Sequence, residues 1–160
     1  MSDPHAAVVA DLEARGVDFD VMPCDPDFAD TAAFCERYGI SPDESANTIL
    51  VVGKSDPRRY VACVVLATTR LDVNGMVRQR LGVKKASFAS ADETRELTGM
   101  LIGGVTPIAL PDGIPVWVDA AVIKPASIVL GGGDRSTKLR MAPQALAALP
   151  GVEVVEGLAR

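Results

Sequence analysis

The segments Thr48-Ile-Leu-Val-Val52 and Tyr60-Val-Ala-Cys-Val-Val-Leu66 are two uninterrupted apolar runs that are rich in β-branched residues. Such runs are typical of β-strands that are buried on both faces. Between them stands Gly53-Lys-Ser-Asp-Pro57, whose residue types favour a reversal of the chain. These segments predict a hairpin whose two strands lie in the middle of a sheet.

Helix and strand signals on both sides of this hairpin predict a mixed architecture. Ser90, for example, is followed by Glu93 in the spacing of a helix capping box. Helices are expected at residues 5–16, 31–38, 73–81, 91–97 and 143–149, and further strands at 17–22, 107–110, 115–118, 126–130, 137–141 and 152–155. Because helices and strands do not alternate regularly, the order favours an α+β fold that is mixed or mainly antiparallel.

Size and composition narrow the class of protein. The 160 residues are enough for one domain with its own core, and we expect a single domain over residues 1–160. The three cysteines have no CxxC spacing and His5 is the only histidine, which argues against a zinc site and against a Ser-His-Asp or Cys-His hydrolase. We expect no metal and no cofactor.

The chain has no recognisable segment for secretion or for the membrane. Residues 1–10 lack the basic start and the long apolar stretch of a secretory signal, and no window approaches the roughly 18 uninterrupted apolar residues of a spanning helix. The cysteine usage is typical of a reducing compartment. We therefore expect a cytoplasmic protein without a membrane partner.

Two glycine-rich loops are candidates for chemistry. Gly103-Gly-Val-Thr-Pro107 can present backbone N–H groups to a carbonyl oxygen that becomes an oxyanion, or it can be a tight turn between a helix and a strand. Gly131-Gly-Gly-Asp-Arg135 can contact a ribose, a phosphate or an amino group, or it can simply connect two strands. It is not a P-loop, because no Gly-Lys-Ser/Thr ending follows.

The charge distribution limits the contacts that nucleic acid could make. A net charge of −5 excludes a general polyanion binder, and an aromatic content of 4% argues against a module that reads bases. Basic residues nevertheless gather in two clusters that could form one rim for a phosphate backbone, or could be solvated surface charges: Arg78, Arg80, Lys84 and Lys85, and then Arg135, Lys138 and Arg140. Asp119, which follows Val116-Trp-Val118, could be a buried carboxylate at a strand end or the cap of the next turn.

Several short motifs occur together in a fixed order between Asp30 and Arg135. They are Asp30-Thr-Ala-Ala33, Asn47-Thr-Ile-Leu-Val-Val52, Arg70-Leu-Asp72, Leu81-Gly-Val-Lys-Lys85, Leu97-Thr-Gly99, Gly103-Gly-Val-Thr-Pro107, Val116-Trp-Val-Asp119 and Gly131-Gly-Gly-Asp-Arg135. In this order, residues 31–155 resemble the YbaK/prolyl-tRNA synthetase editing-domain family, whose members hydrolyse mischarged aminoacyl-tRNA. Each motif is weak by itself, and the resemblance depends on their order.

The resemblance implies a mainly antiparallel, curved sheet that is flanked by helices, with a cleft for the 3′-terminal adenosine of tRNA and its amino acid. It assigns oxyanion stabilisation to Gly103 and Gly104 and orientation of the substrate to Asn47. The remaining implied site residues line the substrate pocket, namely Val105, Thr106, Pro107, Asp119, Gly131, Gly132, Gly133 and Asp134. The implied tRNA contacts are Arg78, Arg80, Lys84, Lys85, Lys138 and Arg140.

The resemblance departs from the family pattern at one position. The family usually carries lysine immediately before the Thr-Leu strand, where this chain has Asn47, and an asparagine donates hydrogen bonds without positive charge. We expect a free-standing deacylase for tRNA carrying a small amino acid. The alternative is a catalytically silent member that only binds an aminoacyl-adenosine-like ligand or a synthetase partner.

Overall fold

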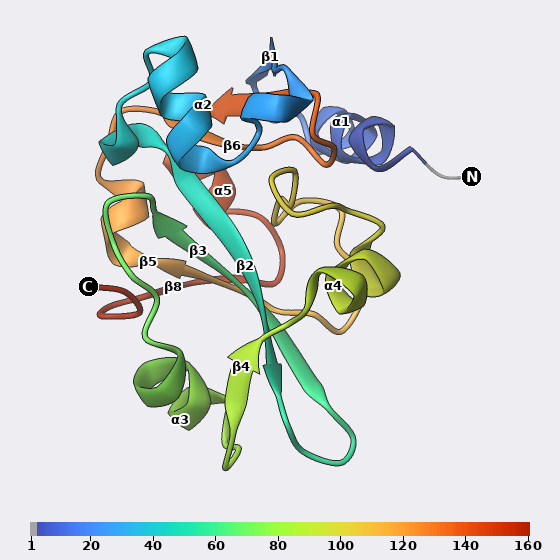
Figure 1. The fold of residues 1–160 in the computed structure, drawn as a ribbon, viewed down its shortest axis with the longest axis vertical. Helices are drawn as coiled ribbons and strands as arrows, with labels where there is room; N and C mark the ends of the chain where they lie inside the picture. The colour runs from blue at the N-terminus through green and yellow to red at the C-terminus, as the bar shows by residue number, and fades with distance from the viewer. Residues whose placement is uncertain (1–2) are drawn as a thin grey trace.

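The computed structural model in Figure 1 describes residues 3–160, so that the first two residues of the expected domain lie outside the described part. Its strands form two sheets. The larger sheet has the order β4 (Ala86–Phe88), β2 (Ala46–Gly53), β3 (Arg59–Leu66), β5 (Val116–Asp119) and β8 (Val152–Val155). The smaller sheet has the order β1 (Phe19–Pro23), β7 (Thr137–Met141) and β6 (Ile128–Gly131).

The β2–β3 hairpin lies inside the larger sheet, as its sequence predicts. The strands pair in antiparallel register from Ala46 opposite Leu66 to Gly53 opposite Arg59, while β4 covers the free edge of β2 and β5 runs parallel to β3. Alternate residues of β3 enter two different cores. Ala62 and Val64 pack on one face and Cys63 and Val65 on the other. A strand buried on both faces requires the continuous apolar run seen in the sequence.

The smaller sheet is antiparallel throughout and meets the larger one near the start of β2. Its central strand β7 pairs with β1 and β6, and Ser45, one residue before β2, forms an isolated bridge with Val129 in β6. In the larger sheet, β5 and β8 are parallel neighbours. The expected mixed, mainly antiparallel α+β architecture is confirmed, with its strands divided between two sheets.

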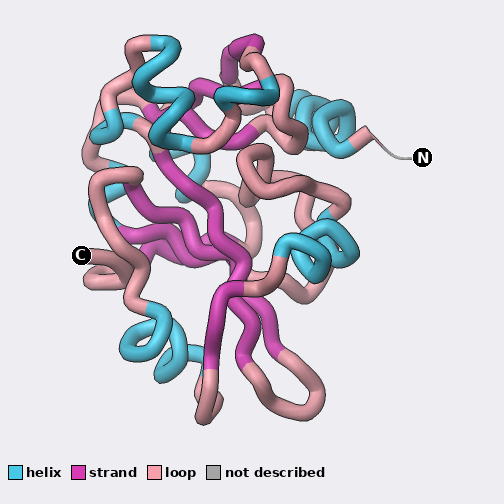
Figure 2. The backbone as a smooth tube through the Cα atoms, viewed as in Figure 1, coloured by secondary structure: helices cyan, strands magenta, loops and turns pink. Residues whose placement is uncertain are grey.

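The helices lie outside the sheets (Figures 1 and 2). The short segment 73–81 begins as one π-helical turn (Val73–Val77) before α3, and residues 26–28, 42–44 and 120–123 form 3₁₀ turns. Glycines in the left-handed conformation close α2 and α4, and the Ser90 hydroxyl accepts a hydrogen bond from the Glu93 N–H, as the capping box predicts. The α-helices are α1 (Pro4–Ala14), α2 (Thr31–Tyr38), α3 (Arg78–Leu81), α4 (Ala91–Thr98) and α5 (Pro143–Ala147). None of the helices within residues 3–160 is long and apolar enough to cross a membrane.

The strand predicted at 107–110 is wrong, because this segment is an irregular loop (Figure 2). Pro107 and Pro111 have no N–H to donate to a ladder, and Ala109 has a positive φ of 60°, which no strand contains. The apolar residues that suggested a strand have another use, since Ile108 is buried in the larger core without joining a sheet. Burial alone therefore produced a strand-like pattern.

Leu12 should be the main anchor of α1, because its side chain is fully buried among residues of the larger core. Leu12→Ala should lower the free energy of unfolding by about 2–5 kcal/mol, the range for truncating a buried leucine. Urea denaturation followed by circular dichroism measures the change. The matched control is Glu13→Ala, which truncates an exposed neighbour on the same helix and should leave stability nearly unchanged. Equal effects of the two substitutions would contradict the packing described above.

Candidate functional site

A cavity of about 440 Å³ lies where the first residues of β2 meet α2, β6 and the loop after α4. This volume is within the range of small-molecule sites in proteins. Its polar lining residues are Asp30, Thr31, Ser45, Asn47, Thr48, Thr94 and Lys138, and its backbone contribution comes from Gly103 and Gly131. Its walls are mainly apolar, made by Ala46, Ile49, Leu50, Phe88, Ala89, Ile102, Val105, Val129 and Leu130. Five of the residues that the sequence predicts for the site are thus brought together: Asn47, Gly103, Val105, Gly131 and Lys138.

Asn47 is held in place by the first residue of α2. The Thr31 hydroxyl donates a short hydrogen bond to Asn47 Oδ1. Since this oxygen accepts from Thr31, the Asn47 amide nitrogen keeps two N–H donors, for which the described residues provide no acceptor. Asn47 also lines a second hollow, together with Thr31, Cys35 and Ala67. The arrangement can orient a ligand by hydrogen bonding without bringing charge.

The backbone of Gly103 reaches the cavity, whereas that of Gly104 does not. Gly103 has a φ of 94°, which favours glycine, and no acceptor for its N–H lies among residues 3–160. The Gly104 N–H instead donates to the Leu101 carbonyl at 2.8 Å. This hydrogen bond within the turn occupies the only backbone donor of Gly104, so it disfavours the implied role of Gly104 as a second oxyanion donor, which stays a prediction.

Gly104 and Gly131 are required for close packing between the two glycine loops. A side chain at Gly104 would overlap the backbone of Asp134, and one at Gly131 would overlap the Val105 carbonyl. The Gly133 N–H then donates to the Gly104 carbonyl at 2.8 Å. The loops 103–107 and 131–135, which are separate candidates in the sequence, thus form one structural unit.

Lys138 is a buried ammonium in the cavity wall. Its side chain lies on β7 with the residue only 6% exposed, and Nζ donates to the Ala29 carbonyl at 2.6 Å and to the Gly103 carbonyl at 2.7 Å. The same nitrogen stands 5.3 Å from the centre of the Phe34 ring. Burial lowers the pKa of this lysine, because neutral carbonyls replace water around the charge. The sequence suggested that Lys138 contacts the tRNA backbone, and its low exposure disfavours that predicted contact.

The remaining basic residues do not form one rim. Asn47 lies near the start of β2, whereas the end of this strand, at Gly53, contacts Leu81 and Val83 beside α3 (Figure 1). The cluster at 78–85 is therefore at the far end of the strand, where Arg80 packs over Trp117 and pairs with Glu153. Arg78 donates to the Asn74 carbonyl, Lys84 and Lys85 are exposed, and Arg140 donates to the Ser127 hydroxyl and pairs with Glu44.

Asp119 makes structural hydrogen bonds and does not line the cavity. It is 3% exposed, and its carboxylate accepts from the Ala121 N–H, which caps the following 3₁₀ turn, and from the Ala159 N–H. The cap alternative is thus confirmed, and Asp119 does not line the cavity, so its implied role in substrate binding stays a prediction that these contacts disfavour.

Several other residues of the implied pocket also lie away from the cavity lining. Gly132 and Asp134 hold the N-terminal region: the Gly132 carbonyl and the Thr137 hydroxyl contact His5 Nδ1, while Asp134 accepts from Ser136 and Thr137. Gly133 packs against Pro4. Thr106 is fully buried, and Pro107 lines a different hollow beside residues 108–116.

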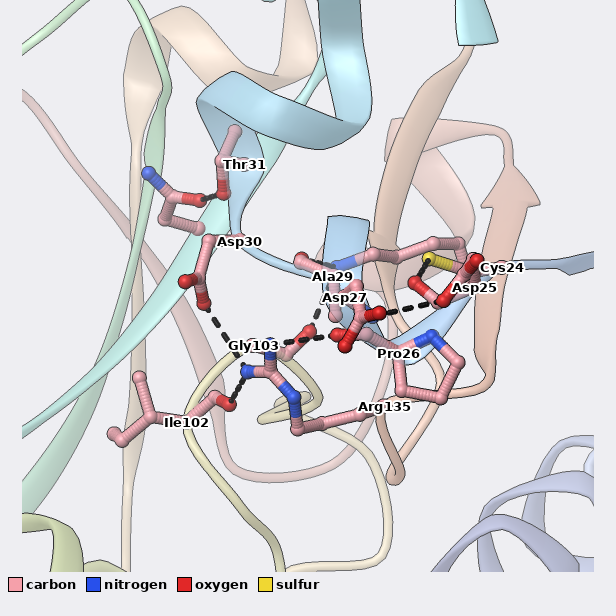
Figure 3. Close-up of polar contacts among 12 residues, drawn as sticks. Cys24, Asp25, Pro26, Asp27, Ala29, Asp30, Thr31, Ile102, Gly103 and Arg135 are labelled. Carbon is pink, nitrogen blue, oxygen red and sulfur yellow. Dashed lines mark hydrogen bonds and ion pairs between the residues drawn. The ribbon is translucent and has the colours of Figure 1, made fainter. Parts of the chain in front are cut away.

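Sequence reasoning missed the apolar walls and one cation. Phe88 and Ile102 line the cavity while remaining 60% and 51% exposed, a combination that only the fold reveals. Arg135, which the sequence predicts only as the end of the second glycine loop and as one of the basic residues, contacts the loop that carries Gly103 (Figure 3). The signal that could have identified it is its place in a glycine loop directly after Asp134.

Comparisons with known proteins relate this chain to one family and to similar folds. The family model described as aminoacyl-tRNA editing domain matches residues 25–149. The protein EbsC of Enterococcus faecalis (strain ATCC 700802 / V583), a proposed Cys-tRNA(Pro)/Cys-tRNA(Cys) deacylase, is 24% identical over 131 residues, which are 81% of this chain and 77% of EbsC. The crystal structure of hypothetical protein APE2540 is similar with a TM-score of 0.84 and 28% identity, over 96% of this chain and 99% of the other. The crystal structure of a proposed trans-editing enzyme for prolyl-tRNA synthetase has a TM-score of 0.82 and 25% identity, over 98% and 97% of the two chains.

The burial of Lys138 should make stability depend on pH in a defined direction. Because the pKa of Lys138 is lowered in the folded protein from 10.5, the unfolded chain binds more protons than the folded one in the window just below pH 10.5. Stability contributed through this group therefore rises as the pH increases through that window. Lys138→Met has no titrating group at this position. The free energy of unfolding of the wild type minus that of Lys138→Met should therefore increase as the pH is raised from 7 towards 10.5.

Urea denaturation at a series of pH values measures this difference. Lys84→Met, which removes an exposed lysine, is the matched control for the loss of one surface charge. A difference between wild type and Lys138→Met that stays constant with pH would contradict a lowered pKa.

Proposed function

This chain belongs to the aminoacyl-tRNA editing domain family, and from that premise we propose that it is a free-standing deacylase that hydrolyses the ester of tRNA mischarged with a small amino acid. The observation that carries the proposal is that one cavity contains Gly103, with a backbone donor that no described residue uses, and Asn47, with two amide donors. The family supports a hydrolase role, and aminoacyl-tRNA as the substrate.

The reaction needs donors for a developing negative charge more than it needs a side-chain nucleophile. Water attacks the ester carbonyl carbon, the carbonyl oxygen becomes an oxyanion, and the bond to the ribose oxygen then breaks. The proton lost by water goes to that ribose oxygen, so the products are the free amino acid and tRNA with its terminal hydroxyl. In the proposed pose, the Gly103 N–H and the Asn47 amide stabilise the oxyanion, each contributing about 2.7–4 kcal/mol if it is correctly placed.

In the proposed site, Lys138 on β7 supplies a positive charge in place of the family lysine, whose position is taken by Asn47. Asn47 is neutral, but the Lys138 ammonium lies in the same cavity wall and donates to the carbonyl of Gly103. A positive charge beside the oxyanion loop favours a tetrahedral intermediate over a neutral ester. Its low exposure preserves this effect, because less water screens the charge.

We propose a small amino acid on two grounds, namely the limited discrimination that a synthetase achieves between small amino acids and the name of one relative. A synthetase gains only about 1–3 kcal/mol from one methylene in its own pocket, so near-isosteric small amino acids require a second selection step. The name of EbsC concerns cysteine on tRNA(Pro) and tRNA(Cys), and cysteine is an amino acid of this size. The apolar walls of the cavity are compatible with a small side chain beside the adenosine.

The tRNA contact of this acidic protein should be limited to the 3′ end. With a net charge of −5 and Lys138 buried, the protein offers few phosphate contacts near the cavity, so we expect weak, salt-sensitive binding. A synthetase partner that delivers or retains the tRNA would offset this weakness, and we propose such a partner on that ground.

The decisive test is release of amino acid from a panel of mischarged tRNAs that carry alanine, cysteine or serine. The wild type should hydrolyse at least one of them faster than buffer does. Asn47→Ala should lower the rate constant for that substrate by about 10²–10³-fold, the effect of losing one side-chain oxyanion donor. Asn74→Ala removes an exposed asparagine amide on the π-helical turn, far from the cavity, and should leave the rate unchanged.

Two results would redirect the interpretation. If the wild type hydrolyses none of the esters while Asn47→Lys creates activity, the natural protein is not an editing enzyme. Tight binding of a non-hydrolysable aminoacyl-adenosine analogue, measured by calorimetry, would then favour the catalytically silent alternative. If neither the analogue nor tRNA binds, both functions are wrong.

A further inference from the structure

We infer that Arg135 is a positioning residue of this site, which orients the peptide group between Ile102 and Gly103 so that the Gly103 N–H faces the cavity. This inference rests on the proposed function, because it concerns the donor that would bind the ester carbonyl. Arg135 lies outside the cavity lining, and it acts on the substrate only through the loop.

Arg135 joins three segments that are distant in the chain (Figure 3). Its NH1 nitrogen donates a short hydrogen bond to the Ile102 carbonyl and a second one to Asp30 Oδ1 at 3.2 Å. Its NH2 nitrogen donates to the Pro26 carbonyl at 2.8 Å. A guanidinium is suited to this task, because it is planar, always charged and carries its donors in a rigid fork. The loop before Gly103 is thereby fixed to the segment that leads into α2.

Peptide geometry converts this contact into a direction for the Gly103 N–H. The peptide group is planar and trans, so its C=O and N–H bonds point in opposite directions. The C=O of Ile102 points to Arg135, and the N–H of Gly103, which belongs to the same peptide group, therefore points away from Arg135. Ile102 and Gly103 both line the cavity, and no described residue accepts from this N–H. The donor is left for a ligand.

The next peptide group is fixed by a second cation. The Gly103 carbonyl accepts from Lys138 Nζ at 2.7 Å, and the Gly104 N–H of the same peptide group donates to Leu101 at 2.8 Å. Two consecutive carbonyls, those of Ile102 and Gly103, are thus each held by a positively charged side chain. A cation at a carbonyl also polarises the peptide group. The contact of Arg135 with the Ile102 carbonyl therefore strengthens the Gly103 N–H, which belongs to the same peptide group, as a donor.

Asp30 uses its carboxylate for the ion pair with Arg135 instead of for capping α2. Asp30 is the N-cap of α2, a position where a carboxylate ordinarily accepts from the first free N–H groups of the helix. Its side chain makes no such cap hydrogen bond and instead pairs with Arg135. The Arg135 contact also requires glycine at position 103, because any side chain there would overlap the guanidinium.

The test is single-turnover deacylation by Arg135→Ala and Arg135→Lys, with the tRNA that the wild type hydrolyses. Losing the orientation of one backbone donor should lower the maximal rate constant by about 10²–10³-fold. The protein concentration at half-maximal rate should change little, because ground-state binding does not depend on this donor. Arg135→Lys should remain impaired, since a single ammonium cannot reach all three acceptors. The matched control is Arg95→Gln, an exposed arginine on α4, which should keep the wild-type rate.

Added guanidinium ion distinguishes positioning from a general loss of structure. It should partly restore the rate of Arg135→Ala by occupying the vacated position, and it should not restore Asn47→Ala. If Arg135→Ala proves unfolded by circular dichroism, the rate of Arg135→Lys decides. A folded variant with the wild-type rate, or a loss confined to substrate binding, overturns the inference while the proposed function stands. If the wild type itself hydrolyses no ester, the proposed function fails, and the inference fails with it.

Discussion

Burial of the β2–β3 hairpin on both faces is the constraint on which the other elements depend. Strand β3 sends alternate residues into two cores, so helices and loops must cover the sheet on each side. Strand β2 follows the same rule over its last four residues, which are buried, whereas Asn47, Thr48 and Ile49 are only partly buried. The cavity lies over these three residues. The candidate site is thus the place where the central strand is not fully covered by other elements.

The two glycine loops complete this site by packing on each other. Gly104 and Gly131 each leave no room for a side chain, and the backbone of Gly133 bonds to that of Gly104. This close approach brings Lys138 and Arg135 against the carbonyls of Gly103 and Ile102. Both cations are directed at neutral carbonyls of one loop, so an acidic protein concentrates positive charge at the site where the proposed reaction develops an anion. The negative net charge and the proposed chemistry are therefore compatible.

Much of the secondary structure follows from local sequence, and the errors have identifiable causes. The bounds of α2 follow from Asp30 and Gly39, and those of β7 and β8 from the glycine- and proline-containing turns on either side of each short segment. The predicted strand at 107–110 failed because buried apolar residues resemble a strand even where prolines prevent a ladder. For the site, resemblance to the family led to Asn47 and Gly103, but it could not show that the Gly104 N–H is used within its own turn. For Asp119 the sequence left a strand-end carboxylate and a turn cap open, and only folding brings its carboxylate to the Ala159 N–H as well as to the nearby Ala121 N–H.

The sequence by itself determined the central hairpin, the α+β class and the family, because each depends on residue types at short range or on motifs in a fixed order. Only the tertiary structure decided which polar groups remain free for a ligand. A hydrogen-bond donor is available only if no other part of the chain uses it, and Lys138, Arg135 and Asp119 each have a partner that lies 33 or more residues away. The basic clusters illustrate the same limit: the one at 78–85 lies near the far end of β2, while Lys138 is enclosed in the cavity wall. Their positions depend on how the sheets pack, and local sequence carries no information about that packing.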